Sequence, residues 1–252
     1  MADFLHGKAA LVTGASRGLG RAMAQALAGA GCRLALVGRD EAMLDESALL
    51  CRAAGAAEAV AFRADITQES EVLALERQVR ARLGPVQILI NNAGMNIRKP
   101  LVDFTLDEWR QVLDTNLTSA FLMCRSFVPH MLGTGYGRVL NLTSTMSHVS
   151  LPGRSAYSSS KAGLLGLTRA LALELAGEGI TVVGISPGPF ATEMNSALLG
   201  DTELNRDFTS RIPVGHWGRP EDLGRLVLYL CSPEAAFITG SDVVIDGGWL
   251  AQ

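Results

Sequence analysis

Short apolar runs alternate with longer amphipathic stretches along the whole of this 252-residue chain. Most of the apolar runs are continuous, as expected for strands that are covered on both faces of a sheet. They predict strands at 9–13, 33–37, 59–63, 86–90, 138–142, 181–185 and 243–245. The amphipathic stretches predict helices at 19–30, 41–54, 68–83, 106–132, 155–177 and 220–231. The alternation therefore predicts an α/β fold, a doubly wound seven-stranded parallel sheet with helices on both faces.

The chain shows no internal repeat, low-complexity linker or break in composition, so residues 1–252 are expected to form a single domain. Residues 190–214 depart from the regular alternation. They follow Pro187-Gly188-Pro189 and contain two short helical pieces, at 197–199 and 203–209. An irregular segment after a strand end lies where such sheets bind ligands, so we expect a substrate lid. A surface excursion without a role is the alternative.

Composition narrows the class of protein. Charged residues make up 19% of the chain, the formal net charge is −3, and no basic run indicates a nucleic-acid surface. The four cysteines and four histidines are scattered, which indicates neither a disulfide framework nor a metal site. No signal peptide or membrane-length apolar run is present. We expect a cytoplasmic protein without metal, nucleic acid or membrane partners.

A glycine-rich turn joins the first predicted strand to the first predicted helix, in Thr13-Gly-Ala-Ser-Arg-Gly-Leu-Gly20. Glycines there allow a tight turn, close approach of a pyrophosphate and close packing of helix on strand, as in Rossmann-type folds. The helix N-terminus then presents free amides to the phosphates. A purely structural turn is the alternative. The residues expected to contact a dinucleotide are Gly14, Ser16, Arg17, Gly18, Leu19 and Gly20.

The end of the second strand indicates which dinucleotide is bound. An acidic residue there would favour NAD, but this chain has Arg39, with Arg17 in the glycine loop. Two guanidinium groups can hold a 2′-phosphate, which favours NADP(H), with NAD(H) as the alternative because Asp40 follows directly. Asp65 and Ile66, after the third strand, are expected beside the adenine, although Asp65 also suits a helix N-terminus.

Polar residues follow the next strands. Asn91-Asn-Ala-Gly94 ends the fourth strand, and Asn92, Ala93 and Gly94 suit a wall against the cofactor, although a turn would use the same residues. Asn116 lies within a long helical stretch, although Asn is a mediocre helix former. Its side chain is either functional or simply faces solvent. Ser144 follows the fifth strand, where its hydroxyl could orient a carbonyl.

Tyr157 and Lys161 are four residues apart in a predicted helix, so their side chains share one face. A nearby ammonium stabilises a phenolate and lowers the pKa of the phenol, which makes the tyrosine usable as a general acid or base. The spacing is common, and a packed tyrosine under a solvated lysine is the ordinary explanation of an isolated pair. Here the pair occurs together with the glycine loop, Asn116 and Ser144.

Together these motifs, with Pro187-Gly188 and Asp246-Gly-Gly, resemble the single-domain form of the short-chain dehydrogenase/reductase family over essentially the whole chain. The resemblance implies a catalytic tetrad of Asn116, Ser144, Tyr157 and Lys161. Tyr157 would be the general acid or base, with its pKa lowered by Lys161, which would also bind the nicotinamide ribose. Ser144 would orient the carbonyl, and Asn116 would hold a water that relays protons. Ile185, Pro187, Gly188 and Thr192 would line the nicotinamide, and no metal is required.

Short local similarities give three substrate classes. The stretch from Asn92 to Pro100 resembles tropinone reductase-like members, and Phe190-Ala-Thr-Glu-Met194 resembles gluconate 5-dehydrogenase-like members. The 3-oxoacyl-[acyl-carrier-protein] reductases share the tetrad and are a third alternative. A basic pair near the site would suit a carboxylate, such as that of a sugar acid, unless Arg98 and Lys99 are exposed loop charges. The substrate is expected to contact Ser144, His148, Arg154, Tyr157 and Met194, with Arg98 nearby.

The expected activity is NADP(H)-dependent interconversion of a ketone and a secondary alcohol. A non-catalytic dinucleotide sensor is the alternative of another class, although such a protein is expected to lose part of the tetrad. The resemblance also implies a homotetramer, or a homodimer, built by pairing the helices at 106–132 and 155–177. Leu164, Leu165, Leu167 and Leu171 would serve such an interface or the core equally well.

Overall fold

A computed structural model describes residues 2–192 and 200–252 of the chain. Its seven strands form one sheet in the order β3-β2-β1-β4-β5-β6-β7, and every neighbouring pair is parallel. The expected doubly wound sheet is confirmed. The strands are β1 (Ala9–Thr13), β2 (Arg33–Gly38), β3 (Glu58–Arg63), β4 (Ile88–Asn91), β5 (Gly137–Leu142), β6 (Ile180–Pro187) and β7 (Asp242–Ile245). The strand order reverses between β1 and β4, which places the binding crevice at their carboxyl ends.

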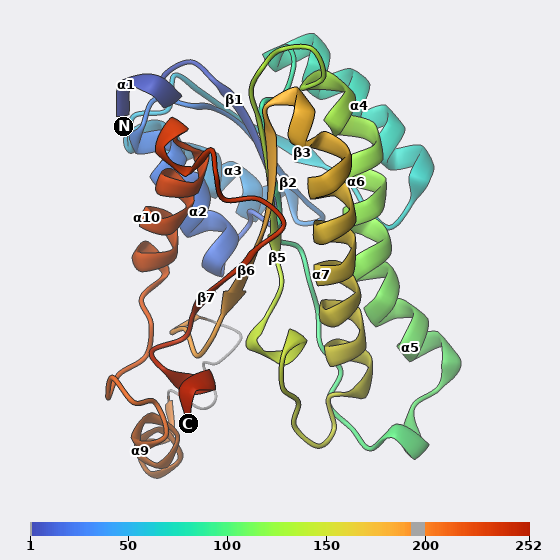
Figure 1. The fold of residues 1–252 in the computed structure, drawn as a ribbon, viewed down its shortest axis with the longest axis vertical. Helices are drawn as coiled ribbons and strands as arrows, with labels where there is room; N and C mark the ends of the chain where they lie inside the picture. The colour runs from blue at the N-terminus through green and yellow to red at the C-terminus, as the bar shows by residue number, and fades with distance from the viewer. Residues whose placement is uncertain (1, 193–199) are drawn as a thin grey trace.

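Helices cover both faces of the sheet, with α2, α3 and α10 on one side and α4, α6 and α7 on the other (Figure 1). The helices on the first side are α2 (Gly18–Gly29), α3 (Glu41–Ala53) and α10 (Pro220–Cys231). Those on the second side are α4 (Glu69–Leu83), α5 (Leu106–Leu113), α6 (Ser119–Phe127) and α7 (Ser155–Leu175). Two further helices are α1 (Ala2–Leu5) and α9 (Thr202–Ser210).

The core is divided by the sheet into two apolar clusters. Successive side chains of a strand point to opposite faces, so Ala10 and Val12 of β1 join one cluster while Leu11 joins the other. All five residues of β1 are buried. This double coverage explains why the strands are continuously apolar in sequence.

The predicted elements lie within about two residues of those observed, with three informative differences. The fourth strand begins at Ile88 rather than at 86, and the amide of Val86 donates to His130 Nδ1 instead. The helical stretch at 106–132 is interrupted by a π-helical turn at Asp114–Thr118 and ends in a 3₁₀ turn at Val128–His130. The short helix α1 was not predicted.

The segment carrying α9 packs on the C-terminal residues of the chain. Phe208 stacks on both Trp217 and Trp249, with ring centroids 4.8 and 5.2 Å apart. Trp217 Nε1 also donates to Asn205 Oδ1 over 2.8 Å. Of the segment expected to form a lid, residues 193–199 lie outside the described residues. The lid therefore stays a prediction, with α9 held against the chain's C-terminal end (Figure 1).

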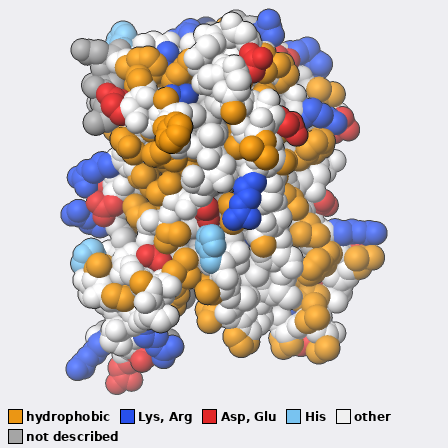
Figure 2. Space-filling view, in the orientation of Figure 1, with side chains coloured by type: hydrophobic (Ala, Val, Ile, Leu, Met, Phe, Trp, Pro, Cys, Tyr) orange, Lys and Arg blue, Asp and Glu red, His pale blue; other side chains and the backbone are white. Residues whose placement is uncertain are grey.

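On the face drawn in Figure 2, acidic and basic side chains are interspersed among hydrophobic and polar ones. None of the described basic side chains on this face merge into a continuous basic surface. Within residues 2–192 and 200–252, no helix has the length and apolar character needed to cross a membrane.

Candidate functional site

The glycine loop after β1 is held against the end of β4 by Thr13 and Asn92. The Thr13 hydroxyl accepts hydrogen bonds from the amides of Asn92 and Ala93, at 3.0 and 3.1 Å. Asn92 Nδ2 donates to the carbonyl oxygens of Thr13 and Gly14, at 2.9 and 3.2 Å. The Asn92 side chain therefore fixes the shape of the loop, a role more specific than the cofactor wall expected from sequence.

Close packing requires glycine in this loop. Gly14 has a φ of +64°, and a Cβ on Gly20 would lie 2.2 Å from the Gly14 carbonyl oxygen. Any side chain at Gly20 would push the loop away from α2. The loop thus brings a bare backbone to the N-terminus of α2, and this arrangement fits the pyrophosphate of a dinucleotide.

Two unpaired arginines lie where the 2′-phosphate of NADP is expected. Arg17 and Arg39 are exposed, and neither has an acidic partner among the described residues. Asp40 is the N-cap of α3, with its carboxylate accepting from the Met43 amide at 3.1 Å. Because Asp40 has this structural role, its presence in the sequence does not by itself argue for NAD.

The residues expected at the adenine lie in a turn. Asp65 Oδ1 accepts from the amide and hydroxyl of Thr67, at 3.0 and 2.7 Å, which stabilises the turn that leads into α4. Ile66 is buried beside it. Asp65 therefore has a structural role at the turn before α4. Its second carboxylate oxygen has no hydrogen-bond partner within the described part of the chain.

Asn116 lies in the π-helical turn and is buried. Its Oδ1 accepts from the Met95 amide at 2.8 Å, and its Nδ2 donates to Met95 O and to Ser160 Oγ, each at 2.9 Å. These bonds tie the loop after β4 to α7. Both amide hydrogens are used, which leaves one lone pair of Oδ1 for a further donor. Gly94 lies beside this group, and a Cβ there would be 3.3 Å from Asn116 Oδ1 and 3.5 Å from Lys161 Nζ.

Lys161 is buried, and its Nζ donates to the Leu142 carbonyl oxygen at the end of β5. Burial lowers the pKa of Lys161 from 10.5 to about 8. Nζ lies 5.8 Å from the centroid of the Tyr157 ring. The expected side-chain pair is therefore close together on α7, one turn apart.

Tyr157 is half-buried and hydrogen-bonds with the side chain of Ser144. Burial raises the pKa of Tyr157, while the Ser144 bond and the charges of Arg154 and Arg98 oppose that rise. The expectation that Lys161 brings the pKa below its ordinary value is wrong for this structure. The physical reasons are that burial dominates and that the ammonium is bonded to Leu142 O rather than to the phenol.

The expected nicotinamide wall follows β6. Pro187 ends this strand, and Thr192 is half-exposed near it. Gly188 is required by packing, because a Cβ there would lie 2.5 Å from Asp246 Cβ. Ile185 is fully buried in the core.

A buried carboxylate that sequence reasoning missed lies beside this wall. Asp242 Oδ1 accepts from Thr143 Oγ1, and its Oδ2 accepts from Ser186 Oγ, both at 2.6 Å. His148 Nε2 lies 2.6 Å from the same Oδ2. The carboxylate thus joins Thr143, which precedes Ser144, to Ser186, which precedes Pro187. It also holds His148, a residue expected to contact the substrate. The available signal was an acid directly before an apolar strand run, at the start of β7.

Arg98 and Arg154 lie together near Tyr157. The loops that carry them are in contact, because a Cβ on Gly153 would lie 3.6 Å from the Lys99 amide nitrogen. Burial lowers the pKa of Arg154, the charge of Arg98 lowers it further, and Tyr157 opposes both. Neither arginine has an acidic partner within residues 2–192 and 200–252. Met194 lies outside the described residues.

Comparisons with known proteins show the family to which the chain belongs. Residues 14–250 match a family model described as enoyl-(acyl carrier protein) reductase. The gluconate 5-dehydrogenase of Gluconobacter oxydans is 34% identical, over 97% of this chain and 95% of that protein. The chain belongs to the short-chain dehydrogenase/reductase family.

Two other members of the family are similarly close. A 3-oxoacyl-[acyl-carrier-protein] reductase of Staphylococcus aureus is 36% identical, over 96% of this chain and 97% of that protein. A structure from Beutenbergia cavernae, described as an NAD(P)-dependent gluconate 5-dehydrogenase with bound NADP, superposes with a TM-score of 0.91. It is 38% identical, and the match covers 98% of each chain.

This short-chain dehydrogenase/reductase is therefore an oxidoreductase that acts on CH–OH groups. The alternative of a sensor without chemistry is set aside. The three other residues of the expected tetrad lie around Tyr157, on α7, in the π-helical turn and just after β5.

Proposed function

We propose that this short-chain dehydrogenase/reductase uses NADP(H) to interconvert a ketone and a secondary alcohol, with Tyr157 as general acid or base. The observation that carries the proposal is the convergence of Tyr157, Ser144 and Lys161, with Lys161 Nζ beside Gly94. The cofactor supplies the hydride chemistry, and the chain supplies position and proton transfer.

Each residue has a distinct role in this proposal. In carbonyl reduction Tyr157 gives its phenolic proton to the substrate oxygen, and the Ser144 hydroxyl donates a hydrogen bond to that oxygen. Lys161, one helical turn away, binds the nicotinamide ribose, and the charges of Arg98 and Arg154 favour the phenolate that remains. Asn116 fixes the loop that carries Gly94, and the remaining lone pair of its Oδ1 accepts from a water that leads protons toward Lys161.

NADP(H) is the proposed cofactor. Arg17 and Arg39 are the cations available for a 2′-phosphate, and the capping role of Asp40 removes the main argument for NAD(H). The remaining proposed contacts are the glycine loop, Asp65 with Ile66, Asn92 to Gly94, and the wall formed by Pro187, Gly188 and Thr192.

The proposed substrate is a sugar acid or a related polyol carboxylate. Arg98 and Arg154 place two positive charges near Tyr157, and each charge lowers the pKa of its phenol. Lys99, by contrast, is already paired with Glu108. A carboxylate would satisfy both arginines while a hydroxyl-bearing carbon of the same molecule faces Tyr157. His148, held by Asp242, is the proposed partner for a further hydroxyl.

A substrate panel tests this proposal. We expect oxidation of gluconate with NADP⁺ to be much faster than oxidation of sorbitol, which lacks the carboxylate. Arg154→Gln and Arg98→Gln should raise the KM for gluconate about tenfold or more, because each removes a charge-assisted hydrogen bond. Lys99→Gln is the matched control and should leave that KM within about twofold.

The second candidate is reduction of a 3-oxoacyl thioester, favoured by the Staphylococcus aureus relative. It is tested with acetoacetyl thioesters and NADPH in the same panel. Turnover of the thioester with no turnover of gluconate would contradict the sugar-acid proposal. Absence of turnover with every substrate and either cofactor would contradict the proposed chemistry as well.

The proposed assembly is a homotetramer or a homodimer that pairs α5–α6 and α7 between copies. Exposed apolar side chains on these helices support it, namely Leu106, Phe121 and Leu173. Of the leucines considered in the sequence, Leu164 and Leu165 are buried in the core. Light scattering of the purified protein would contradict this proposal if it gave a monomer mass.

The proposed compartment is the cytoplasm, where four free cysteines are kept reduced. All four are buried and unpaired, which is typical of cytosolic proteins.

A further inference from the structure

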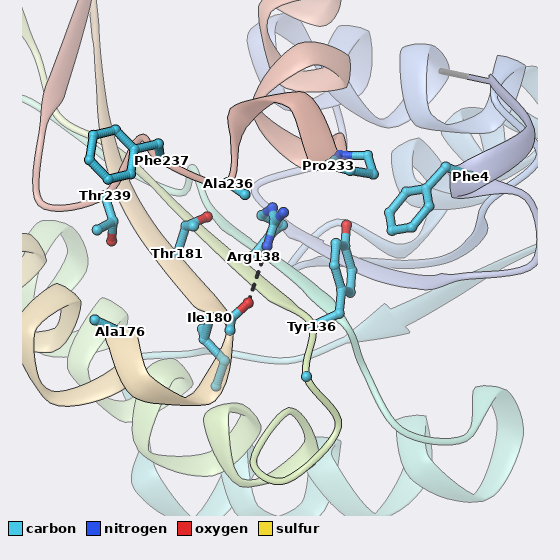
Figure 3. Close-up of a pocket in the computed structure, with 12 residues that line it drawn as sticks. Phe4, Tyr136, Arg138, Ala176, Ile180, Thr181, Pro233, Ala236, Phe237 and Thr239 are labelled. Atoms are coloured by element: carbon cyan, nitrogen blue, oxygen red, sulfur yellow. Dashed lines mark hydrogen bonds between the residues drawn. The ribbon is translucent and has the colours of Figure 1, made fainter.

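A pocket opens at the end of the sheet opposite Ser144, at the amino ends of β5 and β6 (Figure 3). Its volume is about 720 Å³. The walls come from the beginnings of both strands, from α1, and from the turn at Pro233–Ala235 with the residues after it. None of the residues assigned to the reaction or to the dinucleotide lines it.

Arg138, at the base of this pocket, is an arginine with only 3% of its surface exposed. Its Nη1 donates to the Gly137 and Gly179 carbonyl oxygens, at 2.8 and 3.4 Å, and its Nη2 donates to Ser232 O at 3.2 Å. Its Nε has no hydrogen-bond partner among the described residues, and no described carboxylate pairs with the guanidinium. A buried charge that meets only neutral carbonyls and an aromatic ring is costly, so an anion at this place would be stabilised.

Thr181 supplies a second unused polar atom. The residue is 5% exposed, and its Oγ1 finds no partner within the described part of the protein. In the close-up the Thr181 hydroxyl points toward the Arg138 guanidinium (Figure 3). An oxygen atom of a ligand between them would accept from both Arg138 Nε and Thr181 Oγ1.

A second positive charge lies behind the aromatic wall. Lys8 Nζ is 4.3 Å from the ring centroids of both Phe4 and Tyr136, and the Arg138 guanidinium carbon is 4.4 Å from the Tyr136 centroid. Burial lowers the pKa of Lys8, and although Cys32 opposes this, the charge of Arg138 lowers it further. Lys8 has no ion-pair partner in the described ranges. Lys8 and Arg138 therefore both lie against the Tyr136 ring, and their positive charges repel each other.

The acidic residues that lie near the pocket residues in sequence form hydrogen bonds with other groups. Glu178 accepts from the Gly133 amide at 3.0 Å, and Glu234 hydrogen-bonds to Ser232. The apolar part of the lining includes Ile180, Pro233, Ala236 and the fully exposed Phe237. A pocket that combines the positive charge of Arg138 with an apolar lining matches a ligand with one anionic end and one apolar end. Inorganic phosphate would leave the apolar wall uncovered.

We propose that this pocket binds a small organic carboxylate. Its oxygens accept from Arg138 Nε and Thr181 Oγ1, and its short apolar body lies along Ile180, Ala236 and Phe237. Bound there, the carboxylate offsets the charges of Arg138 and Lys8 together.

Hexanoate is a suitable probe, with hexanol and acetate as controls for the charge and for the tail. Calorimetric titration of the full-length protein should show saturable binding of hexanoate and far weaker binding of either control. A crystal soaked in 6-bromohexanoate should place the bromine beside Phe237 by anomalous scattering. No saturable binding, or bromine only at another place, would overturn the proposal.

Two variants test the assigned contacts without touching the reaction site. Thr181→Val keeps the side-chain volume and removes the hydroxyl, so hexanoate should bind about tenfold more weakly. Lys8→Gln should also weaken binding, while both variants keep the parent kcat. Unchanged affinity in both would contradict the site. If Phe237→Ala instead dissociates the native assembly while hexanoate fails to bind, the pocket is an interface between copies and the proposal is wrong.

Discussion

The carboxylate of Asp242 lies 2.6 Å from the imidazole Nε2 of His148, although the two residues are 94 positions apart in the sequence. The same carboxylate accepts from Thr143 and Ser186 and has only 5% of its side chain exposed. It therefore holds the ends of β5 and β6 together, at the place where Ser144 and Pro187 follow.

Asp242→Asn tests this relationship. An amide nitrogen cannot accept a hydrogen bond, so at least one of the three donors loses its partner. We expect the free energy of unfolding in urea to fall by about 1–3 kcal/mol and the kcat to fall as well. Asp45→Asn makes the same change at an exposed position of α3 and serves as the control. Equal effects of the two substitutions would show that Asp242 has no special role.

Tyr157→Phe removes the proposed proton donor and keeps the ring. The kcat should fall by about 10²–10⁴-fold, the range typical of a lost general acid. The Kd for NADPH, measured by fluorescence titration, should stay within about threefold of the parent value. A variant that kept full activity would exclude Tyr157 as the general acid or base.

Arg39→Gln removes one of the two cations expected at the 2′-phosphate. The KM for NADPH should rise about 10–100-fold, since a charge-assisted hydrogen bond is lost, and the KM for NADH should change little. Asp40→Asn retains an oxygen that caps α3 and should leave the NADPH preference intact. An equal increase in the KM for NADPH and for NADH would mean that Arg39 does not contact the 2′-phosphate.

Lys161 makes stability depend on pH. At pH values below about 8 the amine is charged in both the folded and the unfolded chain, so the cost of burying the charge is present in full. Between about 8 and 10.5 the unfolded chain binds more protons than the folded one, and a rise in pH therefore stabilises the fold.

The comparison with Lys161→Met isolates this effect, because other titrating groups are common to both proteins. The unfolding free energy of the parent, minus that of the variant, should increase from pH ~7.5 to pH ~10 by up to about 3 kcal/mol. Denaturant titrations at the two pH values measure it. A difference that does not change with pH would mean that Lys161 is not buried as a neutral amine at high pH.

Much of the fold could be predicted because it depends on local pattern. Continuous apolar runs such as 9–13 have few alternatives to a strand covered on both faces, and the amphipathic stretches between them set the crossovers. The glycine loop and the pair of Tyr157 and Lys161 were found for the same reason, since their spacing along the chain carries their meaning.

The rest depends on contacts between distant segments. The π-helical turn at Asn116 forms where the side chain reaches Met95 and Ser160, and nothing in the local sequence specifies that turn. Likewise, Thr13 and Asn92 meet only because β1 and β4 are neighbours. The pKa of Tyr157 was misjudged because burial, which a sequence does not give, outweighs the effect of a nearby charge.

The stacking of Phe208 on Trp217 and Trp249 joins α9 to the end of the chain through rings that emit light. Only one other tryptophan occurs in the sequence, Trp109 on α5. In a Trp109→Phe background, all tryptophan emission would therefore come from this stack. The protein therefore carries an internal optical reporter of how α9 packs against the end of the chain, with no label attached.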